Sequence, residues 1–392
     1  MSQVHGLVPS KDLGRKSLQS ENYAGGKLVA EHDLVLNRLK AHLGVFARAK
    51  QSGVVSPDYT VLRPKGDAAV QYCESLFKTP MYVGEFRRRT KGIVEGFWRL
   101  YTDDFYNVKA LLPPPDEQDQ IVAYLRAQDV HIARFIRVKR DLIKLLTEQK
   151  LRIIDHAVTR GLDASVALKP SGIEWLGEVP EHWEVLPLRR IIRVKSGDMI
   201  HASVETEEGF PIYGGNGLRG FTDKANCHGP MLLIGRVGAK CGCIHRVEGK
   251  FWASEHALRV IPLRDFDLEF FEHLLRWVDF NRFAIRTAQP LINSTIVREQ
   301  ICAVPPVSEQ VAIRKWIADE CKPLDGTIAR IEEEIKLIRE YRDRLIADVV
   351  TGQVDVRGWQ PGPDDAMDDA ALAALGDDQE DVTEEEDGDG ED

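Results

Sequence analysis

The stretch Pro113-Pro114-Pro115-Asp116-Glu117-Gln118 decides the fold, because the chain repeats it as Pro305-Pro306-Val307-Ser308-Glu309-Gln310. The offset of 192 residues then holds without a gap as far as Val158-Thr159 and Val350-Thr351. This period is too long for a solenoid, whose units usually recur every 20–50 residues. The repeat therefore indicates a duplicated large module, a globular region followed by a helix, and a pseudo-two-fold object.

The globular regions repeat more faintly, at an offset of 198 residues. Arg38 follows the apolar stretch 34–36, as Arg236 follows the apolar stretch 232–234. An alanine and a glycine recur after each arginine at the same spacing. The order of these matches indicates that the globular parts are duplicated as well.

Length and composition bound the class of protein. A chain of 392 residues has room for two or three domains. Six cysteines in so long a chain do not form a disulfide framework, and we expect them to be reduced. The sequence contains no apolar run of membrane-spanning length and no signal-peptide pattern at its beginning. We therefore expect a cytoplasmic protein with no membrane partner.

The net charge of −10 conceals two different regions. Residues 364–392 carry 15 acidic side chains and no Lys or Arg, which leaves 52 basic against 47 acidic residues elsewhere. The chain before residue 364 is therefore mildly basic, which is compatible with a nucleic-acid partner. The acidic end is poor in aromatic residues, and we expect a disordered tail over residues 359–392. A solubilising appendage and a DNA-mimicking strip are the two readings of this tail.

The repeated segments carry apolar residues at heptad spacing, which is typical of a coiled coil. Lys150 and Arg342, at matching positions, each interrupt a seam once. A helix from about Gln128 to Thr159 would be about 45 Å long and would span roughly 13 base pairs. Two such helices make a spacer, whose seam we assign to Ile136, Ile143, Leu146, Ile328, Ile335 and Ile338.

Two motifs that suggest cofactors have simpler explanations. Residues 215–220 fit G-x-G-x-x-G, but no helix pattern follows them, which favours a glycine-rich hairpin turn over a dinucleotide site. Cys241 and Cys243 stand near His245, but their single intervening residue does not suit the spacing of zinc ligands. No Walker A sequence is present. We expect no cofactor, no metal and no catalytic residues.

Candidate DNA contacts lie mainly in turns that follow apolar strands. Arginine pairs bidentately with guanine, Asn and Gln pair with adenine, and either basic residue can contact phosphate. An ordinary surface group or a turn cap is the alternative for each of them. The candidates are Arg38, Lys40, Ser56, Asp58 and Tyr59 in the first globular region, and Asn216, Arg219, Arg236, Lys240, Glu255, His256, Gln289 and Asn293 in the second.

These motifs make the chain resemble the specificity (S) subunits of type I restriction-modification systems. The resemblance rests on the two proline–glutamine segments with their helices and on residues 171–185, SGIEWLGEVPEHWEV. Residues 33–39, 55–59 and 213–217 also resemble this family's target-recognition domains. The resemblance implies an α+β fold in which two such domains are separated by two long helices packed as an antiparallel coiled coil. It further implies a bipartite double-stranded DNA target, methyltransferase (M) subunits docked on the helices, and restriction (R) subunits held through them.

The resemblance divides the chain into five parts. We expect target-recognition domains at 1–112 and 164–304, conserved helical regions at 113–163 and 305–358, and the tail at 359–392. The first recognition domain is shorter at its front by about 27 residues than the second, so we expect it to lack its first strands. A non-catalytic coiled-coil scaffold with protein-binding domains is the alternative function.

Overall fold

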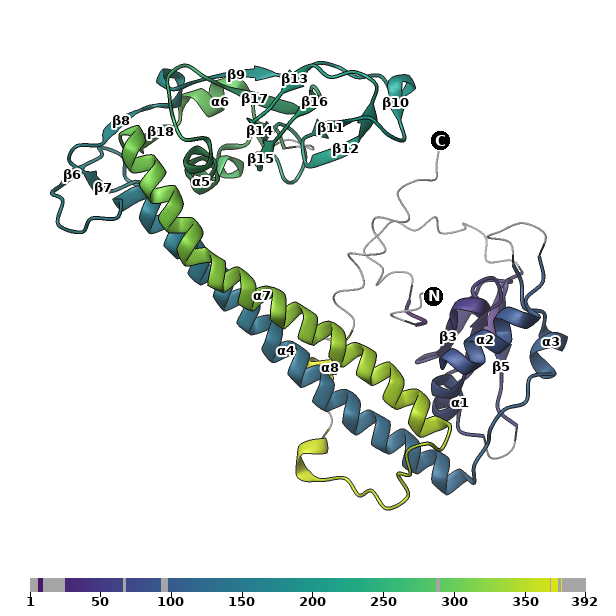
Figure 1. Cartoon of the computed structure of the whole chain (residues 1–392). Helices are drawn as coiled ribbons and strands as arrows, with labels where there is room; N and C mark the ends of the chain where they lie inside the picture. The colour runs from purple at the N-terminus through teal and green to yellow at the C-terminus, as the bar shows by residue number, and fades with distance from the viewer. Residues whose placement is uncertain are drawn as a thin grey trace. The chain divides into compact units, whose positions relative to one another are not determined.

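The computed structural model describes residues 6–9, 25–65, 68–92, 98–286, 290–366, 368–372 and 375. They form an α+β chain, as predicted, that divides into two compact units. Unit 1 comprises Met1–Ile143 with Ala329–Asp392, and unit 2 comprises Lys144–Ile328. Two long helices, α4 (Pro115–Arg160) and α7 (Val307–Val350), each supply residues to both units (Figure 1). Within the described residues, none of the helices has the length and apolarity needed to cross a membrane.

Unit 1 is built on a three-stranded antiparallel sheet in the order β3-β2-β5. A two-stranded sheet of β1 and β4 adjoins a small cluster around Val35, and the helices α1 and α2 cover the larger core around Phe46. The elements are β1 (Lys27–Val29), β2 (Leu34–Asn37), β3 (Phe46–Arg48), β4 (Gly53–Val55), β5 (Tyr59–Leu62), α1 (Val70–Phe77), α2 (Pro80–Arg89) and α3 (Thr102–Tyr106).

Unit 2 contains a four-stranded sheet in the order β15-β14-β17-β9 and a five-stranded sheet in the order β10-β12-β11-β16-β13. Two further strand pairs, β8 with β18 and β6 with β7, lie outside these sheets. The elements are β6 (Leu168–Pro170), β7 (Glu178–Pro180), β8 (Glu184–Pro187), β9 (Ile192–Ser196), β10 (Glu205–Thr206), β11 (Phe210–Gly214), β12 (Gly217–Thr222), β13 (Cys227–His228), β14 (Met231–Gly235), β15 (Ile244–Val247), β16 (Lys250–Ala253), β17 (Ala257–Pro262), α5 (Leu268–Val278), α6 (Ser294–Glu299) and β18 (Ile301–Val304).

The fainter sequence repeat is a repeat of structure. At the offset of 198, β2, β3, β5 and α1 of unit 1 correspond to β14, β15, β17 and α5 of unit 2. In each unit the first of these strands lies between the other two and pairs antiparallel with both. Unit 2 adds β9 at the outer edge of β17. In the described part of unit 1, no strand pairs with the corresponding edge of β5.

The proline-rich segment is itself the first turn of the long helix. Helix α4 begins at Pro115, so the predicted start near Gln128 is wrong by about three and a half turns. Proline suits this position, because the first amides of a helix have no partner within it. Gln118 is buried, accepts a hydrogen bond from the amide of Ala69 at 2.8 Å and donates one to the carbonyl of Pro113 at 2.8 Å. Ala69 directly precedes α1, so this glutamine joins the starts of two helices.

Unit 2 repeats this connection. The side chain of Gln310, also buried, accepts from the amide of Asp267 at 2.8 Å and donates to the carbonyl of Pro305 at 2.9 Å. Asp267 caps α5 by accepting a hydrogen bond from the amide of Phe270. The repeated glutamine therefore fixes each long helix to the helix of its own globular unit.

In both units α4 and α7 pack side by side and antiparallel. In unit 1, Arg342 forms a bidentate ion pair with Asp129 at 2.6 and 3.1 Å. In unit 2, Lys150 lies 2.5 Å from Asp325. The two basic seam residues are thus each paired with an aspartate of the opposite helix. Of the assigned seam, Ile136 and Ile335 are buried, and the rest are half-buried, namely Ile143, Leu146, Ile328 and Ile338.

The chain after α7 folds back onto α4 within unit 1. The ring of Trp359 packs edge-on against Tyr124, with centroids 5.5 Å apart, and its carbonyl accepts a hydrogen bond from Gln120. Residues 359–366 and 368–372 belong to the segment for which disorder was predicted. Their aromatic and ion-pair contacts with α4 give this first part a defined place, which composition alone did not indicate.

We predict that Gln310→Leu lowers the free energy of unfolding of unit 2 by about 1–3 kcal/mol, because it leaves a buried amide and a buried carbonyl without partners. Gln149→Leu, at an exposed position of α4 in the same unit, is the matched control and should change it by less than about 0.5 kcal/mol. Urea denaturation followed by circular dichroism measures both. Equal midpoints for the two variants would contradict the role of the buried glutamine.

Candidate nucleic-acid interface

Four loops meet at one edge of unit 2, where β9, β11, β14 and β16 end. The amide of Ser254, after β16, donates to the carbonyl of Tyr213 in β11 at 3.0 Å. The amide of Asp198, after β9, donates to Ala253 at 2.9 Å, and the amide of Arg236, after β14, donates to His256 at 2.8 Å. These backbone bonds hold together loops that are far apart in the sequence.

Two glycines permit this close approach of the strand ends. A Cβ atom on Gly235 would lie 2.1 Å from the carbonyl oxygen of Gly215, and one on Gly197 would lie 2.2 Å from that of Ser254. Both distances are shorter than any van der Waals contact, so a side chain at either position would force the loops apart. Residues 214–217 close the hairpin between β11 and β12, so the hairpin turn predicted from the glycine-rich sequence is present.

Arg236 holds two of these loops together. Its Nη1 atom donates to Ser196 Oγ at 3.3 Å and to the carbonyl of Glu255 at 3.2 Å. In unit 1, Arg38 donates to the carbonyls of Pro57 at 3.2 Å and Asp58 at 2.8 Å. Pro57 and Glu255 are separated by the same 198 residues as the two arginines. The repeated arginine therefore clamps the equivalent turn in both units.

The remaining candidates divide by exposure and partners. Arg219 pairs with Glu205, and Asn293 caps α6 by accepting from the amide of Ile296 at 2.9 Å. Gln289 lies outside the described residues. The exposed candidates are Lys40, Ser56, Asn216, Arg219, Lys240 and His256, and the half-buried ones are Arg38, Asp58, Tyr59, Arg236, Glu255 and Asn293. Asn216 and Lys240 are exposed loop residues of unit 2 and are accessible to a ligand.

Comparison with known proteins shows what this unit is similar to. Residues 180–338 match the Methylase_S family model, described as the type I restriction modification DNA specificity domain. The chain resembles type I specificity subunits. It is 32% identical over 149 residues to the type I restriction enzyme EcoprrI specificity subunit of Escherichia coli, a match that covers 37% of each chain. The predicted resemblance is confirmed.

Two further likenesses extend over more of the chain. The type I restriction enzyme MjaVIII specificity subunit of Methanocaldococcus jannaschii is 24% identical over 282 residues, which is 64% of both chains. The chain thus matches less than two thirds of the length of either curated relative. A chain from a solved structure on complex assembly and conformational transition of the type I R-M system has the same fold, with a TM-score of 0.61, 13% identity and 84% coverage of each chain.

Unit 2 contains a polar cluster around Asp198 that the sequence did not reveal. Asn226 donates to the Asp198 carboxylate at 2.8 Å, Arg259 lies 3.3 Å from it, and Trp252 donates to the carbonyl of Asp198 at 3.1 Å. In unit 1, Arg99 makes a comparable ion pair with Asp58 at 2.9 Å. The available signal was that Asp198 comes shortly after a strand, β9, in which apolar and polar residues alternate.

Next to this cluster, unit 2 has a hollow of about 580 Å³. Lys224, His228 and Lys250 contribute basic side chains to it, and Phe210 and Trp252 contribute aromatic rings. Cations that contact phosphate and rings that stack on bases are the chemistry of nucleic-acid binding. The hollow and the converging loops offer that chemistry on one unit.

The cysteine and histidine residues nearby form a pair that is partly withdrawn from solvent. Cys243 Sγ lies 3.1 Å from His245 Nε2. Burial lowers the pKa of His245 and raises the pKa of the Cys243 thiol, so both neutral forms are favoured. Among the described residues, no group of three or more His, Cys, Asp or Glu side chains is placed to hold a metal ion.

We predict that Arg236→Met destabilises unit 2 by about 1–2 kcal/mol, because it removes the hydrogen bonds that hold the turn at Glu255. Lys240→Met, on the same exposed loop, should leave the free energy of unfolding within about 0.5 kcal/mol of the wild type. Chemical denaturation of both variants measures the difference. Equal stability of the two variants would show that the arginine does not act as a clamp.

Proposed function

We propose that this chain is the DNA sequence-specificity subunit of a type I restriction-modification complex and has no catalytic activity of its own. The observation that carries the proposal is the match of residues 180–338 to the DNA specificity domain, over the unit whose strand ends gather polar and basic side chains. Asn216, Lys240 and His256 are exposed, and we assign DNA contact to them. Arg236 positions their loops.

The duplication supports a bipartite target. The clamped turn after β14 in unit 2 has its counterpart after β2 in unit 1, which supports one reader at residues 1–112 and a second at 164–304. The helical regions at 113–163 and 305–358 would set the distance between the half-sites. Helices α4 and α7 are each continuous over more than 40 residues, as a rigid spacer requires.

We also assign the helix pair a role in docking methyltransferase (M) subunits, and through them restriction (R) subunits, in the cytoplasm. In unit 1, Phe135, Val138 and Leu142 of α4 are 39%, 61% and 38% exposed. They follow one another at steps of three and four residues, so they lie on one face of the helix. This exposed face, called here the α4 stripe, suits the apolar side of a partner helix.

We predict that Lys240→Ala weakens binding to duplexes of any sequence and lowers the salt slope of binding by about one, because one phosphate contact is lost. Lys322→Ala, at an exposed position of α7, is the control for loss of one positive charge and should leave the slope unchanged. Fluorescence anisotropy at several salt concentrations measures both. No DNA binding by the wild type, alone or with methyltransferase subunits, would favour the coiled-coil scaffold instead.

We predict that inserting one heptad into both helices, after Glu148 and after Asp325, widens the spacer between half-sites by about three base pairs. Seven residues add about 10.5 Å of helix, and they preserve the seam. Methylation-sensitive sequencing of DNA from cells that express the chain with its methyltransferase measures the recognised motif. The bases of each half-site should stay the same. A motif with altered half-sites and an unchanged spacer would contradict the spacer role.

A further inference from the structure

The acidic C-terminal segment is anchored to α4 at two basic residues within unit 1. His131 Nε2 lies 2.6 Å from Asp365 Oδ1. Arg134 donates to the carbonyls of Asp364 at 2.6 Å and Ala366 at 3.2 Å, and its Nε lies 3.3 Å from Asp368 Oδ2. Arg134 thus contacts both the backbone and a carboxylate of the segment. These contacts fix the direction in which the segment runs along the helix.

The segment is built to make these contacts. Asp368 accepts from the amide of Ala371 at 2.9 Å and so begins the short helix α8 (Asp369–Leu372), in which Ala371 is fully buried. Figure 1 shows α8 beside α4. The Ala371 amide and the Arg134 side chain lower the pKa of Asp368, and the Gly362 amide and the His131 side chain lower that of Asp365. Both carboxylates are therefore held in their charged form.

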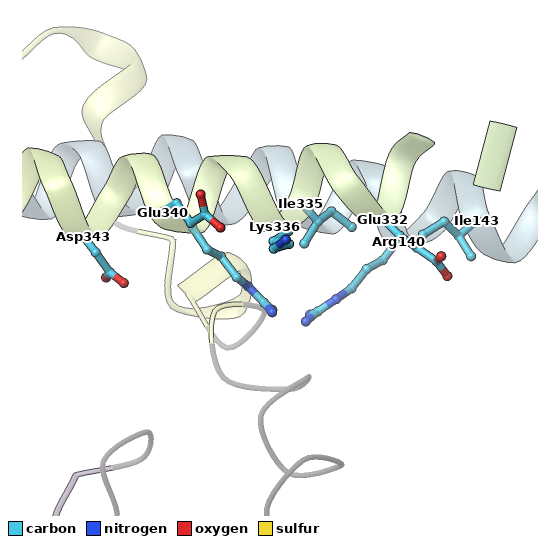
Figure 2. A pocket seen from close by; sticks show the side chains of 8 residues that line it. Arg140, Ile143, Glu332, Ile335, Lys336, Glu340 and Asp343 are labelled. Atoms are coloured by element: carbon cyan, nitrogen blue, oxygen red, sulfur yellow. The ribbon is translucent and has the colours of Figure 1, made fainter. Parts of the chain in front are cut away.

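The face of α4 beside this anchor is both basic and apolar. Residues 130–140 include four Lys or Arg and no acidic residue. The α4 stripe begins at Phe135, one helical turn beyond His131 and therefore on the same face. Arg140 is nine residues beyond His131 and therefore on the opposite side of α4, where it and Ile143 line a hollow of about 480 Å³ together with Lys336 and three acidic residues of α7 (Figure 2). An acidic strand and an amphipathic partner helix would compete for the face of α4 that carries His131, Arg134 and the α4 stripe.

We propose that the C-terminal segment from Asp364 onward is an intramolecular cover for the α4 stripe, which a methyltransferase subunit must displace when it docks. The inference rests on the proposed function, since it assigns regulation to the same docking face. Charge complementarity favours this occupant, because residues 377–392 add 11 acidic side chains and no basic one. The apolar stripe favours a protein helix over DNA as the competing ligand, because DNA offers no apolar face to match it.

Three variants of the full chain test the anchor. Arg134→Gln removes it from the helix side. Asp368→Asn removes the charge from the segment side but keeps a residue that caps helices well. Arg126→Gln is the control, because it removes an exposed charge from the same helix five residues before His131 and therefore on another side of the helix. Hydrogen exchange of the amides at 369–372 should become roughly fivefold faster in the first two variants, a factor that corresponds to about 1 kcal/mol. The control should match the wild type, and unchanged exchange in the first two variants would overturn the docking.

The covering role is tested separately, by titrating the purified methyltransferase subunit into each form of the chain. Asp368→Asn should raise its affinity roughly fivefold, because the cover is weakened while the stripe is unaltered. Combining it with Arg134→Gln should give less than the sum of the two single effects, since both variants remove the Arg134–Asp368 ion pair. Faster exchange without tighter binding would overturn the covering role. Tighter binding of random DNA alone would mean that the segment excludes DNA, which also overturns it. If no form binds the subunit, the proposed function itself fails, whatever the exchange shows.

Discussion

The architecture depends on a buried amide side chain at the start of each long helix. Gln118 and Gln310 satisfy a backbone amide and a backbone carbonyl that burial would otherwise leave without partners. An unsatisfied buried polar group costs about 1–3 kcal/mol, so the long helix and the globular unit are held in one orientation within each unit. The spacer role that we propose for the helix pair requires this kind of fixed joint. A flexible joint would let each globular unit move relative to its helix.

At the edge of unit 2 where four loops meet, some residues position the loops and others are exposed to a ligand. Glycines at 197 and 235 let the strand ends approach, and Arg236 then ties the turn at Glu255 to β9. Because the donors of this arginine are engaged with the turn, our proposal assigns base contact to the exposed residues around it. The occurrence of the same clamp at Arg38 supports this division in both units.

Charge on the helix pair serves two different purposes. Within the seam, Lys150 and Arg342 meet aspartates of the opposite helix, and such partly buried pairs specify alignment more than they add stability. On the outer face, His131 and Arg134 meet carboxylates of the C-terminal segment, where salt screens the attraction. Weak, exposed contacts suit a cover that a partner must be able to remove.

The sequence by itself determined the duplication, the two long helices, their apolar seam and the resemblance to specificity subunits. These follow from periodicity and motif spacing, which are local properties of the chain. Only the tertiary structure decided that α4 begins at Pro115, that Arg38 and Arg236 clamp turns, that Asn293 caps a helix and that Asp198 gathers Asn226 and Arg259. The physical reason is that a polar side chain has few donors and acceptors. Whether they remain available for DNA depends on backbone groups that lie tens of residues away and come close only when the chain is folded.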